Sequence, residues 1–328
     1  MAIRRLIKQI WLKFSPSYRK INHIVTRLES LQNIETRLEN LQNFLSGNLE
    51  RFVNEGAVYI HDYSNYIPKY RNSLKDSKIS EIMENWYKTN HDEINALMQK
   101  FCSFRNFYKN IPFDSQIDFL PKWNNDFMSP FDAMSIYTFL AINNPRYYVE
   151  IGSGNTTMFA AQSINDNQLR TKIISIDPFP RAGIDSLCEK IYRFPLENMD
   201  LSFFSTLSNE DIFLFDGSHR SFPNSDVTVF FTEILHKLPP GLLYAIHDIF
   251  LPFDYPELWS VNERRWYNEQ YLLCAYILGG ASGDKIICPN AFLGRKKEIR
   301  ESCNSLWGNG ELFDNRQFGG GFFWLKKA

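Results

Sequence analysis

Acidic and histidine side chains recur in the second half of this sequence, each directly after a short apolar run. They are Glu150, Asp177, Asp216, His219, His247 and Asp248. Carboxylates accept hydrogen bonds from the hydroxyl groups of a ribose or hold divalent cations, and a histidine can take a proton from a hydroxyl group near neutral pH. If the fold brings these residues together, they predict a site that binds a nucleotide-type ligand and transfers a proton.

The segment YYVEIGSGNTT at residues 147–157 supplies a backbone for such a site. Its first five residues are typical of a buried strand, and Gly152-Ser153-Gly154 is a turn that only small residues make. Asn155, Thr156 and Thr157 offer caps for a helix that we expect to begin near Met158. Free N–H groups at such a turn bind polar groups of a ligand. Thr157 stands where the dinucleotide fingerprint has its third glycine, so an NAD-dependent dehydrogenase is a weaker interpretation.

The elements that must position these residues alternate between strand and helix, as in a parallel sheet. We expect strands at Tyr147–Ile151, Lys172–Ile176, Ile191–Phe194, Ile212–Phe215 and Leu242–Ile246, then an antiparallel pair at Lys285–Cys288 and Phe322–Leu325. We expect helices at Phe131–Ile142 and Asp226–Lys237. The prediction is an α/β fold with a doubly wound, mostly parallel seven-stranded sheet. Ligands bind beyond the carboxyl ends of the strands in such a sheet, which is where the polar residues stand.

Five motifs in this region resemble the successive motifs of bacterial class I S-adenosylmethionine (SAM) methyltransferases. They are EIGSGNTT, ISIDPFPR, DIFLFDGSH, PNSDVT and AIHDIFLPFDYP. Among these enzymes the chain looks most like the macrolide-sugar O-methyltransferases and the cephalosporin hydroxylase-like proteins. The resemblance covers roughly residues 125–328 and implies a Rossmann-like methyltransferase domain that uses SAM as its cofactor.

The resemblance also implies roles for individual residues. Those that would bind SAM are Glu150, Gly152, Ser153 and Gly154 around its methionine part, and Asp177 at its ribose. Asp216 matches a metal-binding aspartate, and His219 matches the base that follows it by three residues. After the fifth strand the family has an acidic pair on the metal; here Asp248 matches and His247 does not. Oxygen ligands favour Mg²⁺ or Ca²⁺, whereas an imidazole ligand from His247 favours Mn²⁺, Fe²⁺ or Zn²⁺.

Several of these residues have a competing structural interpretation. His219 is either the base or a cap, and His247 is either a metal ligand or a buried hydrogen-bonding group. The segment 250–273 carries the aromatic and charged residues Trp259, Arg264, Arg265, Trp266, Tyr267 and Glu269. It either overhangs the site and binds the acceptor or packs against its own helices.

The N-terminal region differs in character from the rest of the chain. Residues 1–14 predict a basic amphipathic helix, which either contacts an anionic membrane or packs on its own protein. TRLESLQN at 26–33 and TRLENLQN at 36–43 repeat with a period of ten residues, which is a heptad plus three. This pattern predicts a coiled coil that makes a homo-oligomer, with a folded-back helix as the alternative. We therefore expect an extension at 1–50, a helical connecting region at 51–130 and a catalytic domain at 131–328.

Composition narrows the classes of partner. The formal net charge of −1 argues against nucleic acid, and 44% hydrophobic residues allow a large core. The five cysteines are scattered and form no CxxC pair, which fits a reducing, cytoplasmic location, with contact at the inner membrane face as an addition. No segment has the run of about 18 apolar residues that a membrane span needs.

The sequence thus predicts a SAM-dependent O-methyltransferase that acts on a hydroxyl group of a small polar or glycan-like acceptor, with a divalent cation as a further cofactor. Two alternatives stay open. One is a metal-dependent oxygenase or hydrolase on the same fold, because Asp216, His219, His247 and Asp248 contain the ingredients of a two-histidine, one-carboxylate site. The other is a non-catalytic scaffold recruited to a membrane by the N-terminal helices.

Overall fold

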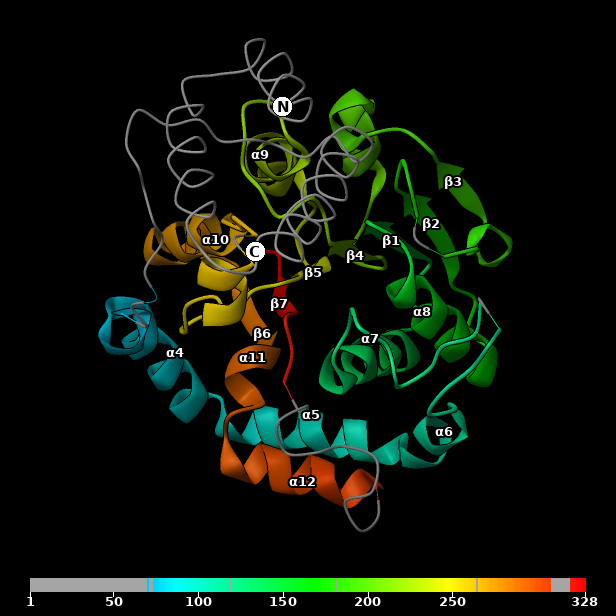
Figure 1. Ribbon diagram of the computed structural model, residues 1–328, viewed down its shortest axis with the longest axis horizontal. Helices are drawn as coiled ribbons and strands as arrows, with labels where there is room; N and C mark the ends of the chain where they lie inside the picture. Colours follow the sequence, from blue (N-terminus) through cyan, green and yellow to red (C-terminus); the bar gives the residue numbers. More distant parts are fainter. Residues whose placement is uncertain (1–69, 71–72, 118, 181, 264, 308–318) are drawn as a thin grey trace, which may run out of the picture. The chain divides into compact units, whose positions relative to one another are not determined.

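Seven strands form one mixed sheet at the centre of the described part of the chain (Figure 1). The structure is a computed structural model and describes residues 70, 73–117, 119–180, 182–263, 265–307 and 319–328. The amphipathic helix and the coiled coil predicted within residues 1–50 lie outside the described residues. The predictions for the rest of the chain can be compared with the structure.

The strand bounds agree closely with the sequence pattern. The strands are β1 Tyr147–Ile151, β2 Lys172–Ile176, β3 Lys190–Tyr192, β4 Ile212–Phe215, β5 Leu243–Ile246, β6 Lys285–Pro289 and β7 Phe323–Lys326. Their order is β3-β2-β1-β4-β5-β7-β6, with parallel pairing from β3 through β5. β7 is antiparallel to both β5 and β6. The predicted doubly wound, seven-stranded, Rossmann-like sheet with a closing antiparallel pair is confirmed.

The order of the strands decides where a ligand can bind. The chain builds β1, β2 and β3 outward in one direction and then returns to place β4 on the other side of β1. The crossover connections on the two sides of β1 therefore diverge, and they leave a crevice at the carboxyl ends of β1 and β4. β5 lies beside β4 in parallel register, so its carboxyl end opens onto the same edge.

Helices flank the sheet and complete the core. They are α4 Lys78–Thr89, α5 His91–Ser103, α6 Arg105–Asn110, α7 Pro130–Asn143, α8 Asn155–Asp166, α9 Asp226–Val229, α10 Glu269–Leu278, α11 Asn290–Leu293 and α12 Lys297–Trp307. Figure 1 shows α5 and α12 side by side, and the two are in contact. Short 3₁₀ turns occur at Ser73–Asp76, Asp185–Leu187, Leu196–Asn198, Leu201–Thr206 and Ala281–Gly283, and a π turn occurs at Leu258–Asn262.

Helix α7 is buried on every side. Each residue from Pro130 to Leu140 is buried, and Ser129 caps the helix by accepting a hydrogen bond from the backbone N–H of Asp132. Such a helix matches the prediction for Phe131–Ile142. It also carries one charged residue, Asp132, into the interior, where its side chain must find hydrogen-bond partners.

The predicted helix at Asp226–Lys237 is continuous but not uniform. Only α9, at its start, is α-helical; a π turn at Phe230–Ile234 and a 3₁₀ turn at Leu235–Lys237 follow. The widened turn accompanies the ring of Phe230, which stacks on Phe215 of β4 with ring centroids 4.3 Å apart. The π turn thus coincides with packing against the sheet, which the helical periodicity of the sequence does not reveal.

Two further observations bear on the predictions from composition. Cys102, Cys188, Cys274 and Cys288 form no disulfide with one another and are buried or partly buried. No helix in the described ranges combines the length and the apolar character that crossing a membrane requires.

Candidate functional site

The glycine turn after β1 has little freedom to change. Gly152 has φ +77°, and a Cβ atom built on it would lie 1.8 Å from the backbone oxygen of Asp216. Only glycine permits both this conformation and this approach. The contact joins the carboxyl end of β1 to that of β4, as the sequence predicted for the residues on these strands.

Glu150 supports the turn from inside the protein. Its side chain is fully buried, and its Oε1 accepts a hydrogen bond from the hydroxyl group of Thr157. The hydroxyl oxygen of Thr157 in turn accepts from the backbone N–H of Gly154 at 3.0 Å. Helix α8 therefore begins at Asn155, three residues earlier than predicted. Thr157, which stands where the dinucleotide fingerprint has its third glycine, thus closes the turn through these two hydrogen bonds.

The carboxyl group of Glu150 is in an unusual electrostatic environment. Burial raises its pKa to about 7, against the lowering effect of hydrogen bonds from Thr157 and its neighbours. Its second oxygen, Oε2, is buried and has no hydrogen-bond partner among the described residues. The turn therefore contains a buried acceptor atom that a donor could satisfy.

Asp177 links the ends of β1 and β2. Its Oδ2 accepts from the backbone N–H of Ser153, and its Oδ1 accepts from that of Phe179, each at 2.8 Å. A carboxylate oxygen has two lone pairs, so both atoms can still accept a hydrogen bond from a ligand. The ring of Phe179 is 86% exposed beside it.

The other four predicted residues meet at the ends of β4 and β5. Nε2 of His219 lies 3.6 Å from Oδ1 of Asp216 and 3.5 Å from Oδ2 of Asp248. Nδ1 of His247 lies 3.1 Å from Oδ1 of Asp216 and 3.6 Å from Oδ1 of Asp248. Each of the two imidazole rings therefore faces both aspartates.

The backbone at this cluster is strained. His219 has φ +64° and Asp248 has φ +54°, both in the left-handed region that side chains other than glycine rarely adopt. Such conformations persist where the surrounding structure imposes them, and they collect at functional sites. The strain places both side chains on the same edge of the sheet.

A further carboxylate lies on the other side of each histidine ring, away from Asp216 and Asp248. Nδ1 of His219 is 3.2 Å from Oε1 of Glu269, and Nε2 of His247 is 3.5 Å from Oδ2 of Asp132. Glu269 and Asp132 are both almost completely buried. The result is two chains of groups that run from the interior toward Asp216, one through each imidazole.

These carboxylates control the charge of the histidines. Burial alone would lower the pKa of His219, but the negative charges of Glu269, Asp248 and Asp216 outweigh it and raise the pKa to about 9. For His247 the effect of burial is likewise outweighed by Asp216 and Asp248, and its pKa lies well above the ordinary value. Burial raises the pKa of Glu269. With a pKa of about 9, His219 is mostly protonated at neutral pH, and the surroundings of His247 favour its charged form as well.

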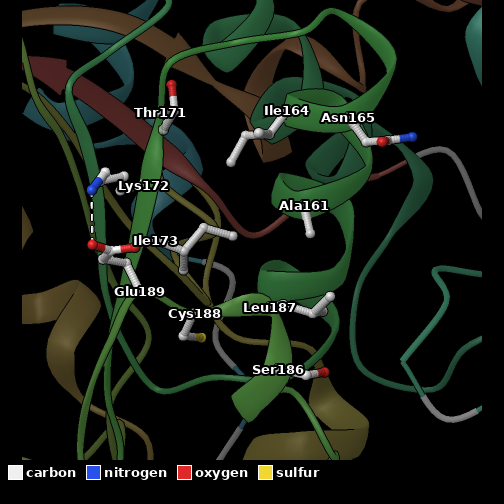
Figure 2. A pocket seen from close by; sticks show the side chains of 10 residues that line it. All are labelled: Ala161, Ile164, Asn165, Thr171, Lys172, Ile173, Ser186, Leu187, Cys188 and Glu189. Atoms are coloured by element: carbon white, nitrogen blue, oxygen red, sulfur yellow. Dashed lines mark hydrogen bonds and ion pairs between the residues drawn. The ribbon is translucent and has the colours of Figure 1, made fainter.

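A cavity of about 300 Å³ opens where the two halves of the site meet. Ser153, Gly154, Asp216 and His247 are among the residues that line it, together with Lys122 and residues 124–128. Glu150 lies behind this lining. A larger cavity of about 380 Å³ lies between α8 and the start of β2, near Lys172 and Glu189 (Figure 2). It is at the other end of the strands from Asp177 and Asp216, so the smaller cavity is the one associated with the site.

The segment after β5 covers the second half of the site with aromatic rings. The ring of Tyr267 packs on His219 with centroids 4.4 Å apart, and the guanidinium group of Arg265 lies 4.0 Å from the ring centroid of Trp259. Arg264, which the sequence also singled out, lies outside the described residues. The segment therefore packs on its own protein and borders the site, whereas its binding of the acceptor stays a prediction.

Sequence reasoning missed the roles of two residues. Asp132 appeared only as part of an apolar helix, and Glu269 only as one of several polar groups in a loop. A charged residue within the otherwise apolar run PFDAMSIYTFLAI is the signal that could have identified Asp132. Glu269 has no comparable signal, because its partner is 50 residues away in the chain.

Comparison with known proteins supports the fold. Residues 149–249 match a family model described as a methyltransferase domain. No curated protein matches the chain. A solved structure of the MycE methyltransferase from the mycinamycin biosynthetic pathway, in complex with Mg, SAH and mycinamycin VI, is 20% identical, with 51% of this chain and 48% of that chain covered and a TM-score of 0.33. The similarity therefore spans about half of the length of MycE.

Two further solved structures are similar over a larger share of their length. The apo form of CmcI is 14% identical, with 86% of this chain and 94% of that chain covered and a TM-score of 0.35. The O-methyltransferase TomG from Streptomyces achromogenes, which is involved in tomaymycin synthesis, was solved with SAM; it is 16% identical, with 75% and 98% covered and a TM-score of 0.30. The family match over residues 149–249 and the strand order of the sheet agree in indicating a Rossmann-like methyltransferase fold.

Proposed function

We propose that this protein transfers the methyl group of SAM to a hydroxyl group of a small polar or glycan-like acceptor. The observation that carries the proposal is the position of Asp216. Its backbone oxygen packs against Gly152 of the glycine turn, and its carboxylate faces His219 and His247. One residue therefore joins the part of the site suited to a cofactor to the part suited to proton transfer, beside a single cavity.

The residues of the glycine turn fit the cofactor. No atom lies within 4 Å of the position that a Cβ atom would occupy on Gly154, so the space above the turn is open. Oε2 of Glu150 is a buried acceptor without a partner, which suits an ammonium group or a water molecule held by one. Asp177 retains lone pairs for ribose hydroxyl groups. Bound SAM supplies an activated methyl group on a good leaving group, so the protein has to orient the acceptor and remove its proton.

His219 is the residue best placed to remove that proton. Its Nδ1 faces Glu269, which leaves Nε2 for the acceptor hydroxyl group. Nε2 faces Asp216 and Asp248, and Asp216 also lines the cavity. A hydroxyl group of a sugar is too weak an acid to ionise by itself near neutral pH, so a positioned base accelerates the transfer.

The predicted divalent cation at Asp216, His247 and Asp248 remains a prediction. Both ring nitrogens of His247 face carboxylates, so the ring would have to give up a contact to bind a cation. Within the described ranges, no three His, Cys, Asp or Glu side chains are arranged to hold a metal ion. The proposed methyl transfer therefore includes no metal-dependent step, and the geometry does not favour the metal-dependent oxygenase or hydrolase.

The donor atoms nevertheless allow a specific test of cation binding. Two carboxylates with an imidazole suit Mn²⁺ better than Mg²⁺, which prefers oxygen ligands. We expect electron paramagnetic resonance titration to detect Mn²⁺ binding that Mg²⁺ displaces only in excess and that Asp248→Asn weakens at least about tenfold. The exposed residue Asp92 provides the control Asp92→Asn. Mn²⁺ binding that is unaffected by Asp248→Asn would place the cation elsewhere.

The N-terminal extension adds two elements to the proposal. The coiled coil predicted there makes a homo-oligomer, and the basic helix contacts an anionic membrane surface. Neither element enters the chemistry of methyl transfer.

The test of the proposal has a binding arm and a transfer arm. Calorimetry with SAM should show binding that Asp177→Ala weakens at least about tenfold, because a charged hydrogen-bond partner is lost. Incubation with tritiated methyl-SAM and a panel of sugars and glycosides should label an acceptor, and His219→Ala should abolish the labelling. A protein that binds neither SAM nor its demethylated product would falsify the proposal.

A further inference from the structure

Glu269 is buried at the first position of α10 and lies against His219. We propose that Glu269 is a positioning residue, which fixes the His219 ring so that Nδ1 keeps a proton and Nε2 is presented to the acceptor. This inference rests on the proposed function, because it assigns the group that prepares the base of that reaction.

The backbone connects the two residues independently of their side chains. The N–H of Asn268 donates to the backbone oxygen of His219 at 2.9 Å, and the side-chain oxygen of Asn268 accepts from the N–H of Ser221 at 2.7 Å. The start of α10 is thus fixed to the turn that carries His219. The backbone of Glu269, the next residue, is therefore held beside the turn that carries the imidazole.

One oxygen of Glu269 receives both of its donors. The hydroxyl group of Tyr255 donates to Oε1 at 3.1 Å, and Nδ1 of His219 is 3.2 Å from the same atom. Oε2 is buried and has no hydrogen-bond partner among the described residues. Because Tyr255 also accepts from the backbone N–H of Gln270, the carboxylate is held on two sides.

A carboxylate cannot donate a hydrogen bond when ionised, so the ring nitrogen that faces it must be the donor. Nε2 lies farther from its own carboxylate neighbours, at 3.5 Å from Asp248 and 3.6 Å from Asp216, and we assign it as the atom that exchanges a proton with the substrate. The competing explanation is that Glu269 only stabilises α10, since an acidic residue in a first turn interacts favourably with the helix dipole. That explanation predicts an effect on stability and none on the His219 ring.

The pattern of donors makes two substitutions informative. In Glu269→Gln the amide oxygen should take the place of Oε1, because both neighbours there are donors, and the amide nitrogen should take the place of Oε2. The charge is lost and the orientation of the ring is kept. Glu269→Leu removes the acceptor altogether. The exposed Glu257 in the preceding segment provides the control Glu257→Leu.

The experiment measures the ring and the turnover separately. NMR of the full chain labelled with nitrogen-15 histidine reports the Nδ1–H of His219, assigned by its absence in His219→Ala. We expect this signal in the wild type, Glu269→Gln and Glu257→Leu, and its loss in Glu269→Leu. With the sugar acceptor labelled in the transfer assay, kcat should fall by about 10²–10⁴ in Glu269→Leu and by less than about tenfold in Glu269→Gln, with KM little changed.

The failures of the two proposals can be told apart. An unchanged Nδ1–H signal or an unchanged kcat in a Glu269→Leu protein that still binds SAM would overturn the positioning role and leave the methyltransferase proposal intact. Equal losses of kcat in the Gln and Leu variants would also overturn it, because charge and not orientation would then be the contribution. Absence of SAM binding in the wild type would remove the proposed function itself.

Discussion

At the scale of single residues, the site is a set of acidic groups that fix the state of two histidines. His219 and His247 each lie between carboxylates on both sides of the ring. A lone histidine titrates near pH 6.5, whereas the surroundings of His219 raise its pKa to about 9. The consequence for catalysis is a base that is mostly protonated at neutral pH until the charges around it change.

The pKa of His219 leads to a prediction for the pH dependence of methyl transfer. The base works only when Nε2 is free, and the unprotonated fraction of a group with a pKa of about 9 rises with pH up to that value. The rate at saturating SAM should therefore rise about tenfold per pH unit below pH 9 and level off above it. A pH series in the tritium transfer assay measures this, and a rate that falls between pH 7 and pH 9 would contradict it.

Gly152 supports a second prediction at this scale. A methyl group there would meet the backbone oxygen of Asp216 in a conformation that already disfavours side chains. We expect Gly152→Ala to lower the free energy of unfolding by more than about 2 kcal/mol and to abolish SAM binding. Urea denaturation and calorimetry measure the two effects. Gly183→Ala is the control, since nothing lies within 4 Å of the added carbon; equal stability of the two variants would disprove the argument.

At the scale of elements, the sequence predicted the strands well and the helices less completely. β1, β2 and β4 have the predicted bounds because each is an apolar run that ends in a polar group or a glycine. β3 begins one residue earlier and ends two residues earlier than predicted, at the edge of the sheet, where burial constrains the pattern less. The π turn at Phe230–Ile234 depends on ring stacking with β4, which local sequence does not encode.

The contacts between elements are what the sequence could not reveal. Asp132 of α7 accepts hydrogen bonds from the backbone N–H groups of Gly321 and Phe322, at 2.7 and 2.9 Å, and from the side chain of Asn290 at 2.8 Å. More than 150 residues separate Asp132 from each of these partners. No periodicity or motif relates them, because the fold alone brings α7 beside the segment that leads into β7.

This network predicts that Asp132 holds three elements together. Asp132→Ala would leave two buried backbone N–H groups without an acceptor, reduce the Asn290 amide to its hydrogen bond with Ser135, and remove a charge that faces His247. We expect a loss of about 3–5 kcal/mol in the free energy of unfolding, measured by urea denaturation. The exposed Asp92 supplies the control Asp92→Ala, which should change stability by less than about 0.5 kcal/mol. Similar values for both variants would show that the network contributes little.

At the scale of the whole molecule, the reversal of strand order between β1 and β4 assembles the site. The residues proposed to bind SAM come from the ends of β1 and β2. The residues proposed for proton transfer come from the ends of β4 and β5 and from the start of α10. The alternation of strands with helices predicted this convergence in general terms, because parallel strands share a carboxyl edge. The second carboxylate behind each histidine could not be predicted, because it comes from a helix whose docking depends on the complete fold.

The N-terminal repeat leads to a prediction about the oligomeric state of the protein. Leu31 of the first copy and Leu38 of the second are one heptad apart, so both face the seam of the predicted coiled coil. Because a charge in such a seam opposes association, Leu31→Lys with Leu38→Lys should convert an oligomer of the full chain into a monomer, as measured by sedimentation velocity. Gln32→Lys adds the same charge outside the seam and should keep the oligomer. SAM binding should persist in both variants, since the binding residues all lie beyond residue 149; a wild type that sediments as a monomer would show instead that the repeat folds back on its own chain.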